Sequence, residues 1–248
     1  MTGQAAVDTA TTWLASWDRQ QESYIPHREA RFDFLTSVIT AAGGTTARVL
    51  DLGCGPGSLL VRLCRSYPDT VLVGIDYDPV LLTIAAALLP NTTLLDADLR
   101  RPGWQTAAEG LSPYDMVVSC TALHWLSAKE IVGTYAAAFA LLRPGGLILN
   151  ADTMPITGGP ALSGLLATAL GATSDTSPWN HWWQGLGSER AYEPQLAERD
   201  QRQRAYPRTG EFITDARWHQ NALRANGFDE AAVIWRTGHE AIVAGRRP

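Results

Sequence analysis

The chain has 248 residues, which is enough for one large α/β domain with a full hydrophobic core. Apolar residues make up 46% and charged residues 18% of the sequence, a balance that excludes extensive disorder. The net charge of −5 lacks the basic excess of nucleic-acid-binding proteins, so we expect no DNA or RNA partner.

The cysteines and the apolar runs indicate the compartment. Cys54, Cys64 and Cys120 have neither the number nor the spacing of a disulfide framework or a zinc site, so no metal is expected. No basic start followed by an apolar run opens the sequence, and no stretch reaches the roughly 18 apolar residues of a membrane span. We therefore expect a cytoplasmic protein without a membrane partner.

Residues 1–44 are expected to form helices that cap the domain. After a mobile start, helical character surrounds residues 13–17. A clear helix begins at Pro26, a residue that suits the first helical turn, and Gly43 and Gly44 end it.

Strands and helices then alternate, which predicts a parallel sheet with helices on both faces. The last of these helices opens with a capping box formed by Ser127 and Glu130. The expected strands are 47–52, 70–75, 92–95, 115–119 and 147–150, and the expected helices are 59–65, 79–89 and 128–142.

Residues 153–212 interrupt the alternation with Gly, Pro, Ser and Trp. This insertion is too long for a plain loop and is expected to form a lid over the substrate. Pairs of opposite charge at i,i+4 spacing predict a solvated helix at 199–208.

A helix at 214–225 and strands at 232–235 and 241–244 are expected to close the chain. No repeat or linker divides the sequence. We therefore expect residues 1–248 to form a single domain, as a monomer or a homodimer.

A glycine-rich loop joins the first strand to the following helix, in the sequence Asp-Leu-Gly-Cys-Gly-Pro-Gly from Asp51. Glycines at such a position let the backbone approach a ligand closely. The dinucleotide fingerprint Gly-x-Gly-x-x-Gly fails, because Ser58 stands where its third glycine belongs. The acidic Asp51 opposes a pyrophosphate and suits a ligand that carries an ammonium or sulfonium group.

Two more carboxylates follow the next strands. Asp76 ends the second strand, where a carboxylate can accept both hydroxyls of a ribose, and Asp98 follows the third. Three successive strand ends with carboxylates form a constellation rather than an isolated motif.

These features resemble the class I S-adenosylmethionine-dependent methyltransferases of the small-molecule type, nearest to the trans-aconitate methyltransferase-like branch. The stretches that carry the resemblance, over residues 45–152, are VLDLGCGPG, GIDYDP, DADL, YDMVVSCTALHWL and LLRPGGLILNAD. The resemblance implies S-adenosylmethionine as cofactor. It also implies a three-layer Rossmann-like sandwich with a mostly parallel seven-stranded sheet whose last strand is antiparallel.

The resemblance further implies where the cofactor binds. Asp76 would hold the ribose hydroxyls, and Asp98 would hold the adenine amino group beside the Leu99 backbone. Tyr77 would pack on the adenine. The residues implied to surround the methionine part are Asp51, Gly53, Gly55, Gly57 and Thr121.

The predicted cofactor site has an alternative explanation for Gly57 and includes two further residues, Tyr24 and Arg28, from the N-terminal segment. Gly57 has the alternative role of a glycine that only starts a helix. In some small-molecule members an N-terminal helix covers the cofactor, and Tyr24 and Arg28 share a helix face four residues apart. Arg28 would then pair with the methionine carboxylate, the alternative being a solvated arginine.

His124 and a set of tryptophans are the candidates for acceptor binding. His124 follows the fourth strand and is either a general base or a structural histidine bonded to backbone. The candidate substrate-binding residues are His124, Trp125, Trp179, Trp182 and Trp183, and the tryptophans of the insertion have the alternative of packing the lid onto the core. O-methylation of a small molecule is the first expectation. N- or C-methylation, and cofactor binding without methyl transfer, remain open.

Overall fold

A seven-stranded sheet forms the centre of the computed structural model, which describes residues 3–157, 159–171, 175–207 and 210–248. The strand order is β3-β2-β1-β4-β5-β7-β6. The strands are β1 (Arg48–Leu52), β2 (Val71–Asp76), β3 (Thr93–Asp96), β4 (Tyr114–Cys120), β5 (Leu142–Thr153), β6 (Glu230–Thr237) and β7 (Glu240–Arg246). β1 to β5 pair in parallel, and β7 runs antiparallel to both of its neighbours. The predicted sheet with its antiparallel last strand is confirmed.

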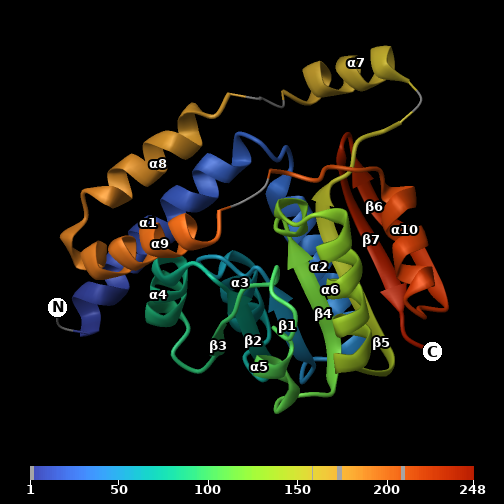
Figure 1. Cartoon of the computed structure of the whole chain (residues 1–248), viewed down its shortest axis with the longest axis horizontal. Helices are drawn as coiled ribbons and strands as arrows, with labels where there is room; N and C mark the ends of the chain where they lie inside the picture. The colour runs from blue at the N-terminus through green and yellow to red at the C-terminus, as the bar shows by residue number, and fades with distance from the viewer. Residues whose placement is uncertain (1–2, 158, 172–174, 208–209) are drawn as a thin grey trace.

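Helices cover both faces of the sheet (Figure 1). One layer contains α2 (Arg28–Gly43), α3 (Ser58–Ser66) and α4 (Pro79–Leu88), and the other contains α5 (Thr106–Glu109), α6 (Ala128–Leu141) and α10 (Ala216–Ala225). Each layer packs its own apolar cluster against the sheet. In β4 the neighbours Val117 and Val118 are both fully buried in opposite clusters, because successive side chains of a strand point to opposite faces.

The strand register brings the carboxyl ends of the central strands to one edge. Leu52 of β1 lies opposite Ile75 of β2 and Ser119 of β4, and Ser119 lies opposite Asn150 of β5. The residues that follow these positions therefore meet at the same edge, where parallel α/β sheets bind ligands.

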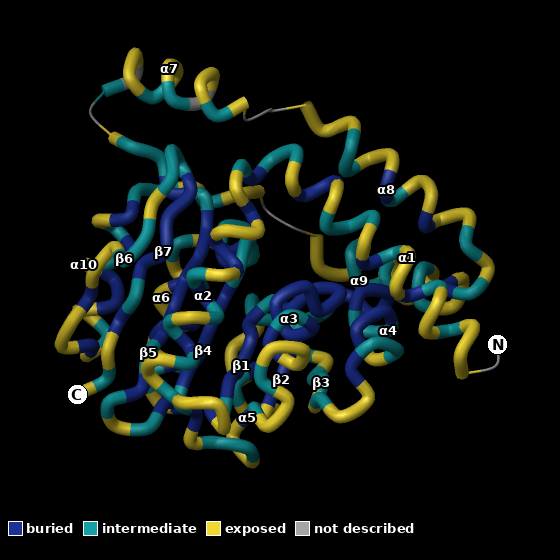
Figure 2. Tube along the Cα trace, turned by 180° about the vertical axis from the view of Figure 1, so that it is seen from behind, coloured by how far each residue is buried: buried dark blue, intermediate teal, exposed yellow. Residues whose placement is uncertain are grey.

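The N-terminal segment and the insertion add helices above this edge. α1 (Gly3–Glu22) is helical from Gly3, so the expected mobile start is wrong for the described residues. The insertion contains α7 (Pro160–Leu170), α8 (Ser177–Gly187), the 3₁₀ helix η2 (Arg190–Tyr192) and α9 (Glu193–Ala205). α8 and α9 lie near α1, whereas α7 lies apart above β6 and β7, with much of its surface exposed (Figures 1 and 2). In the described part of the chain, no helix is long and apolar enough to cross a membrane.

Tryptophans fasten α8 to α1. Trp182 is buried, its Nε1 donates to Ser16 Oγ at 2.9 Å, and its ring meets those of Trp13 and Trp17 at centroid distances of 5.6 and 4.8 Å. This packing stabilises the insertion against the N-terminal cap.

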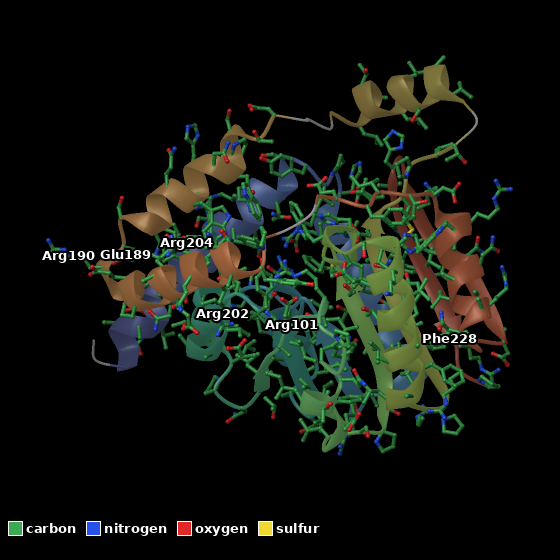
Figure 3. All side chains as sticks on the ribbon, in the orientation of Figure 1. Arg101, Glu189, Arg190, Arg202, Arg204 and Phe228 are labelled. Atoms are coloured by element: carbon green, nitrogen blue, oxygen red, sulfur yellow. The ribbon has the colours of Figure 1, made fainter. Side chains whose placement is uncertain are left out.

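Arginines fasten α9 to the sheet edge. Arg199 Nε donates to Asp78 Oδ2 at 2.7 Å, and Arg202 pairs with Asp96 at 2.6 Å and donates to the Tyr77 carbonyl. Figure 3 shows Arg202 on α9, above the β3 side of the sheet. The predicted i,i+4 pair of Glu198 and Arg202 is present, and α9 has no buried residue, as expected of a solvated helix. The structure adds the ion pairs of Arg199 and Arg202 with the sheet end, which the sequence analysis did not predict.

We predict that Trp182→Ala lowers the free energy of unfolding by about 3–5 kcal/mol, because it removes a buried indole. Urea denaturation measures the change. Ser16→Ala removes only the hydrogen-bond acceptor and should cost about 1 kcal/mol. Equal losses in the two variants would contradict a packing role for the Trp182 ring.

Candidate active site

A cavity of about 630 Å³ lies at the carboxyl edge of the sheet. The predicted site residues that line it are Tyr24, Gly53, Gly55, Asp76, Tyr77, Asp98, Leu99, Thr121, His124, Trp125, Trp179 and Trp183. A smaller cavity of about 60 Å³ shares Gly53, Gly55 and Thr121 with it and adds Arg28 and Asp51. The structure thus brings fourteen of the sixteen predicted residues into two adjoining spaces.

The two exceptions among the described residues are Gly57 and Trp182, which line neither of these cavities. Gly57 precedes α3 with φ +88°, and a Cβ there would lie 3.0 Å from the Leu89 side chain. This geometry is that of a helix-start glycine, the alternative stated for this residue. Trp182 packs against α1, as described above.

The loop between β1 and α3 is shaped by two glycines. Gly53 and Gly55 have φ of +72° and +55°, and a Cβ on Gly53 would lie 2.4 Å from the Ala122 Cβ. The Gly55 N–H donates to Asp76 Oδ2 at 2.8 Å, which ties the loop to the end of β2.

Asp51 is a buried carboxylate without a complete set of partners. It is 2% exposed, and its Oδ1 has no hydrogen-bond partner among the described residues. Burial, reinforced by the charge of Asp76, raises the pKa of Asp51 to about 8. A cationic ligand group would compensate this charge, which fits an ammonium group.

Arg28 faces the same small cavity and is 5% exposed, so the solvated alternative for this residue is wrong. Its Nη1 binds Asp18 at 2.7 Å, whereas its Nε has no partner among the described residues. A guanidinium and the carboxylate of Asp51 in one small space match the two charges of an amino acid. The residues present therefore fit the methionine part of S-adenosylmethionine.

Asp76, the residue predicted to bind the ribose hydroxyls, lies at the end of β2 and lines the cavity. Its two oxygens accept the N–H groups of Gly55 and Asp78 at 2.8 and 2.9 Å. Burial raises the pKa of Asp76 to about 6 despite these bonds, so its carboxylate is ionised at neutral pH. Its remaining lone pairs are available to hydroxyl donors.

Asp98 and Tyr77 surround an arginine that the sequence analysis did not single out. Arg100 donates to both Asp98 oxygens at 2.8 and 2.7 Å, and its guanidinium lies 4.9 Å from the Tyr77 ring centroid. Arg100 also lies 4.6 Å from the Tyr206 ring centroid. The adenine end of the cavity is thus walled by an ion pair and aromatic rings. The one available signal for Arg100 was its position two residues after Asp98.

His124 forms a buried pair with Asp152, a second residue missed from the sequence. His124 Nδ1 lies 2.7 Å from Asp152 Oδ1, and the His124 backbone N–H donates to Asp152 Oδ2 at 3.1 Å. Burial alone would lower the pKa of His124, but the charge and hydrogen bond of Asp152, with Glu211 and Glu240, outweigh it and raise the pKa. Because the carboxylate accepts the Nδ1 proton, the neutral ring presents Nε2 as a base.

A fully buried arginine supports the Thr121 corner. Arg31 binds Glu240 at 2.7 Å and donates to Thr121 Oγ1 at 2.6 Å. Thr121 has φ +58°, an uncommon value for a residue other than glycine. Arg31 and Glu240 are far apart in the sequence, so no local pattern could have paired them.

Comparisons with known proteins bear on the class. Residues 49–146 match the family described as "Methyltransferase domain". The trans-aconitate 2-methyltransferase of Yersinia pestis (strain Pestoides F) is 29% identical over 143 residues, which are 58% of this chain and 50% of that protein. The trans-aconitate 2-methyltransferase of Klebsiella pneumoniae (strain 342) is 36% identical over 90 residues, which are 36% of this chain and 33% of that protein.

Solved methyltransferases share the fold. An S-adenosylmethionine-bound amino pentose methyltransferase from Micromonospora echinaspora gives a TM-score of 0.56 at 19% identity, covering 88% of this chain and 91% of that one. The magnesium protoporphyrin IX methyltransferase of Synechocystis PCC 6803, with bound S-adenosylhomocysteine, gives 0.57 at 16%, covering 96% and 95%.

The sheet topology is shared with solved class I S-adenosylmethionine-dependent methyltransferases, and residues 49–146 match a methyltransferase domain. The chain is therefore similar to that class in its fold and in the matched segment, which covers less than half of its residues. It spans about half the length of the curated relatives that it matches, so their acceptors are not carried over by the likeness.

We predict that Asp51→Asn stabilises the ligand-free protein and weakens S-adenosylmethionine binding. The pKa of Asp51 is about 8 in the folded protein and 3.8 in the unfolded chain. Ionisation of this carboxyl therefore destabilises the fold increasingly as the pH rises from 4 to 8. The gain in melting temperature should therefore be larger at pH 8 than at pH 5. Thermal unfolding at both pH values measures it, and a gain independent of pH would contradict the assignment.

Proposed function

We propose that the chain transfers the methyl group of S-adenosylmethionine to a hydroxyl group of a small molecule. The observation that carries this proposal is the His124–Asp152 pair, whose histidine lines the same cavity as the glycine loop and the Asp76 carboxylate. A base beside a cofactor cradle suits an acceptor that arrives protonated. When bound, the cofactor supplies a methyl group already activated by a positively charged sulfur.

The chain's own residues would hold the cofactor by its charges and hydroxyls. Arg28 and Asp51 suit the carboxylate and ammonium of the methionine part, and Asp76 suits the ribose diol. Tyr77 and the paired Asp98 line the adenine end. These contacts would align the methyl carbon with the acceptor, and this alignment is the main requirement of a displacement at an activated methyl group.

His124 would accept the acceptor's hydroxyl proton at Nε2. Asp152 holds the imidazole in the required tautomer and stabilises the imidazolium that forms. The deprotonated acceptor oxygen would then take the methyl group that the cofactor supplies when bound, and the electron pair of the sulfur–carbon bond would remain on sulfur. The proton leaves to solvent from His124 after the product departs.

The insertion is proposed to act as the lid of this site. Trp179 and Trp183 of α8 line the cavity, and the Trp179 N–H donates to the Tyr24 hydroxyl at 3.0 Å. The insertion and the N-terminal cap thus meet over the cavity. Such a cover excludes water from the reacting groups.

We predict that Asp76→Ala weakens S-adenosylmethionine binding by at least about tenfold, since hydrogen bonds to charged groups contribute about 1.5–3 kcal/mol each. Isothermal titration measures the affinity. Asp229→Ala, at an exposed pair with Arg246, is the matched control and should bind normally. Unchanged affinity in Asp76→Ala would remove this residue from the cofactor site.

We predict that His124→Ala lowers kcat by about 10²–10⁴-fold with little change in cofactor affinity. The loss should shrink for an acceptor that is already ionised, because no proton then needs removal. His181→Ala, at an exposed histidine of α8, should keep full activity. A joint loss of melting temperature and cofactor affinity in His124→Ala would instead support the structural role.

The pH profile should separate the role of Asp152 from a merely structural one. The rate should fall as the pH drops through the pKa of His124, which lies above its ordinary value of 6.5. Asp152→Asn removes the charge that raises this pKa, so the acid limb should move to lower pH while kcat falls. An acid limb that stays in place would show that Asp152 does not tune His124.

A further inference from the structure

The acceptor end of the larger cavity has a composition that restricts its substrate. We define this end by the lining residues outside the cofactor cradle, chiefly Trp125, Trp179, Trp183, Glu211 and Glu240. Building on the proposed function, we infer that the acceptor is an uncharged planar aromatic molecule with a hydroxyl group, not a carboxylic acid.

The charges around the cavity argue against an anionic acceptor. Arg100 is the single arginine or lysine among the described residues that line the larger cavity, and its Nε and Nη2 donate to Asp98 while its Nη1 donates to the Tyr206 carbonyl. The carboxylates that line the same cavity are Asp76, Asp78, Asp98, Glu211 and Glu240. An acceptor carboxylate would therefore meet these carboxylates without an unpaired arginine or lysine to balance its charge.

The neighbouring arginines are bound to protein carboxylates. Arg31 is held by Glu240, and Arg199 is held by Asp78 while it lies 3.6 Å from the Trp183 ring centroid. Withdrawing either from its partner would leave a buried carboxylate unpaired, which is costly.

Flat apolar surfaces favour an aromatic acceptor. The Trp125 and Trp179 rings are 6.4 Å apart with an interplanar angle of 34°, and Trp179 and Trp183 are 5.8 Å apart. Leu170 and Ile213 add apolar surface to the same cavity. These indoles pack against one another and line the cavity together, so an aromatic acceptor could extend the cluster by offset and edge contacts.

A cationic acceptor suits the site less well than an uncharged one. Tryptophans and carboxylates do attract cations. However, the cofactor that this cavity is proposed to hold carries a positive sulfur next to the reacting atom. A protonated amine also lacks the lone pair that must attack, whereas a phenolic hydroxyl needs only the base that His124 provides.

Binding of matched probes to the complex with S-adenosylhomocysteine tests the inference without chemistry. The probes are 2-naphthol, 6-hydroxy-2-naphthoate, 2-naphthylmethylamine and trans-aconitate, each titrated by calorimetry at pH 7.5. We expect 2-naphthol to bind at least about tenfold more tightly than each charged probe, a difference of about 1.4 kcal/mol. A charged probe that binds as tightly as 2-naphthol, or failure of all four to bind, overturns the inference.

Two variants locate the preference in the acceptor end. Trp179→Ala should weaken 2-naphthol binding about tenfold, whereas Trp13→Ala, in the same aromatic cluster but outside the cavity lining, should not. Glu211→Arg should raise the affinity for 6-hydroxy-2-naphthoate several-fold relative to 2-naphthol. Asp200→Arg, at an exposed position of α9, is its control. Ratios that stay unchanged in both site variants contradict the inference.

The outcome is separable from that of the proposed function. Methylation of trans-aconitate with retained S-adenosylhomocysteine binding would leave methyl transfer standing and refute the aromatic acceptor. Failure of the wild-type protein to bind S-adenosylhomocysteine would instead refute the proposed function. Melting temperatures and S-adenosylhomocysteine affinities of the variants separate a folding defect from a loss of acceptor binding.

Discussion

Negative charge concentrated at the carboxyl edge of the sheet is the constraint on which the rest of the structure depends. The parallel register places Asp51, Asp76 and Asp152 near the carboxyl ends of β1, β2 and β5, where desolvation disfavours their ionised forms. Each of these carboxylates must be protonated, paired with a cation or hydrogen-bond donor, or left to bind a ligand group. Asp152 is paired with His124, whereas Asp51 keeps an unpartnered oxygen and an elevated pKa. The unsatisfied carboxylate is thus the one that faces the proposed cofactor cradle, and stability is given up there in exchange for binding.

The paired carboxylates of the same edge have a structural task. Asp78 and Asp96 hold Arg199 and Arg202 of α9, and Glu240 holds Arg31 of α2. These contacts dock the insertion and the N-terminal cap on the sheet end. Tryptophans then join the two covers to each other through α1 and α8. The insertion and the N-terminal cap are therefore held over the cavity by carboxylates that would otherwise repel one another.

The sheet could be predicted from the sequence because local signals agree along residues 47–150. Apolar runs that end in glycine or an acidic residue mark β1 and β2, and a capping box marks α6. β5 is longer than the predicted 147–150 because its register with β4 shifts, between Tyr114 and Met116, and so admits the Pro-Gly-Gly segment. α5 is only four residues long and gives no helical period.

The cofactor cradle was largely predictable, whereas the contacts that tune the site were not. Gly53 and Gly55 are recognisable because a tight loop next to a ligand needs their backbone freedom. Asp152 is 28 residues from His124 and becomes its partner only through the pairing of β4 with β5. Sequence spacing also cannot decide which tryptophan of α8 faces the cavity, since that depends on where α1 lies. The Trp182 side chain packs against α1, whereas Trp179 and Trp183 line the cavity.

The charge balance also connects the two halves of the proposed reaction. With the methionine part in place, the positive sulfur would lie among carboxylates such as Asp76 and would offset part of their field. The same positive charge favours ionisation of a nearby acceptor hydroxyl, so His124 needs to remove a proton that is already acidified. A second anionic group on the acceptor would gain much less, because Glu211 lines the same cavity and the single arginine or lysine among the described lining residues, Arg100, is paired with Asp98. A sheet edge that is rich in carboxylates can therefore bind a cationic cofactor and still favour an uncharged acceptor.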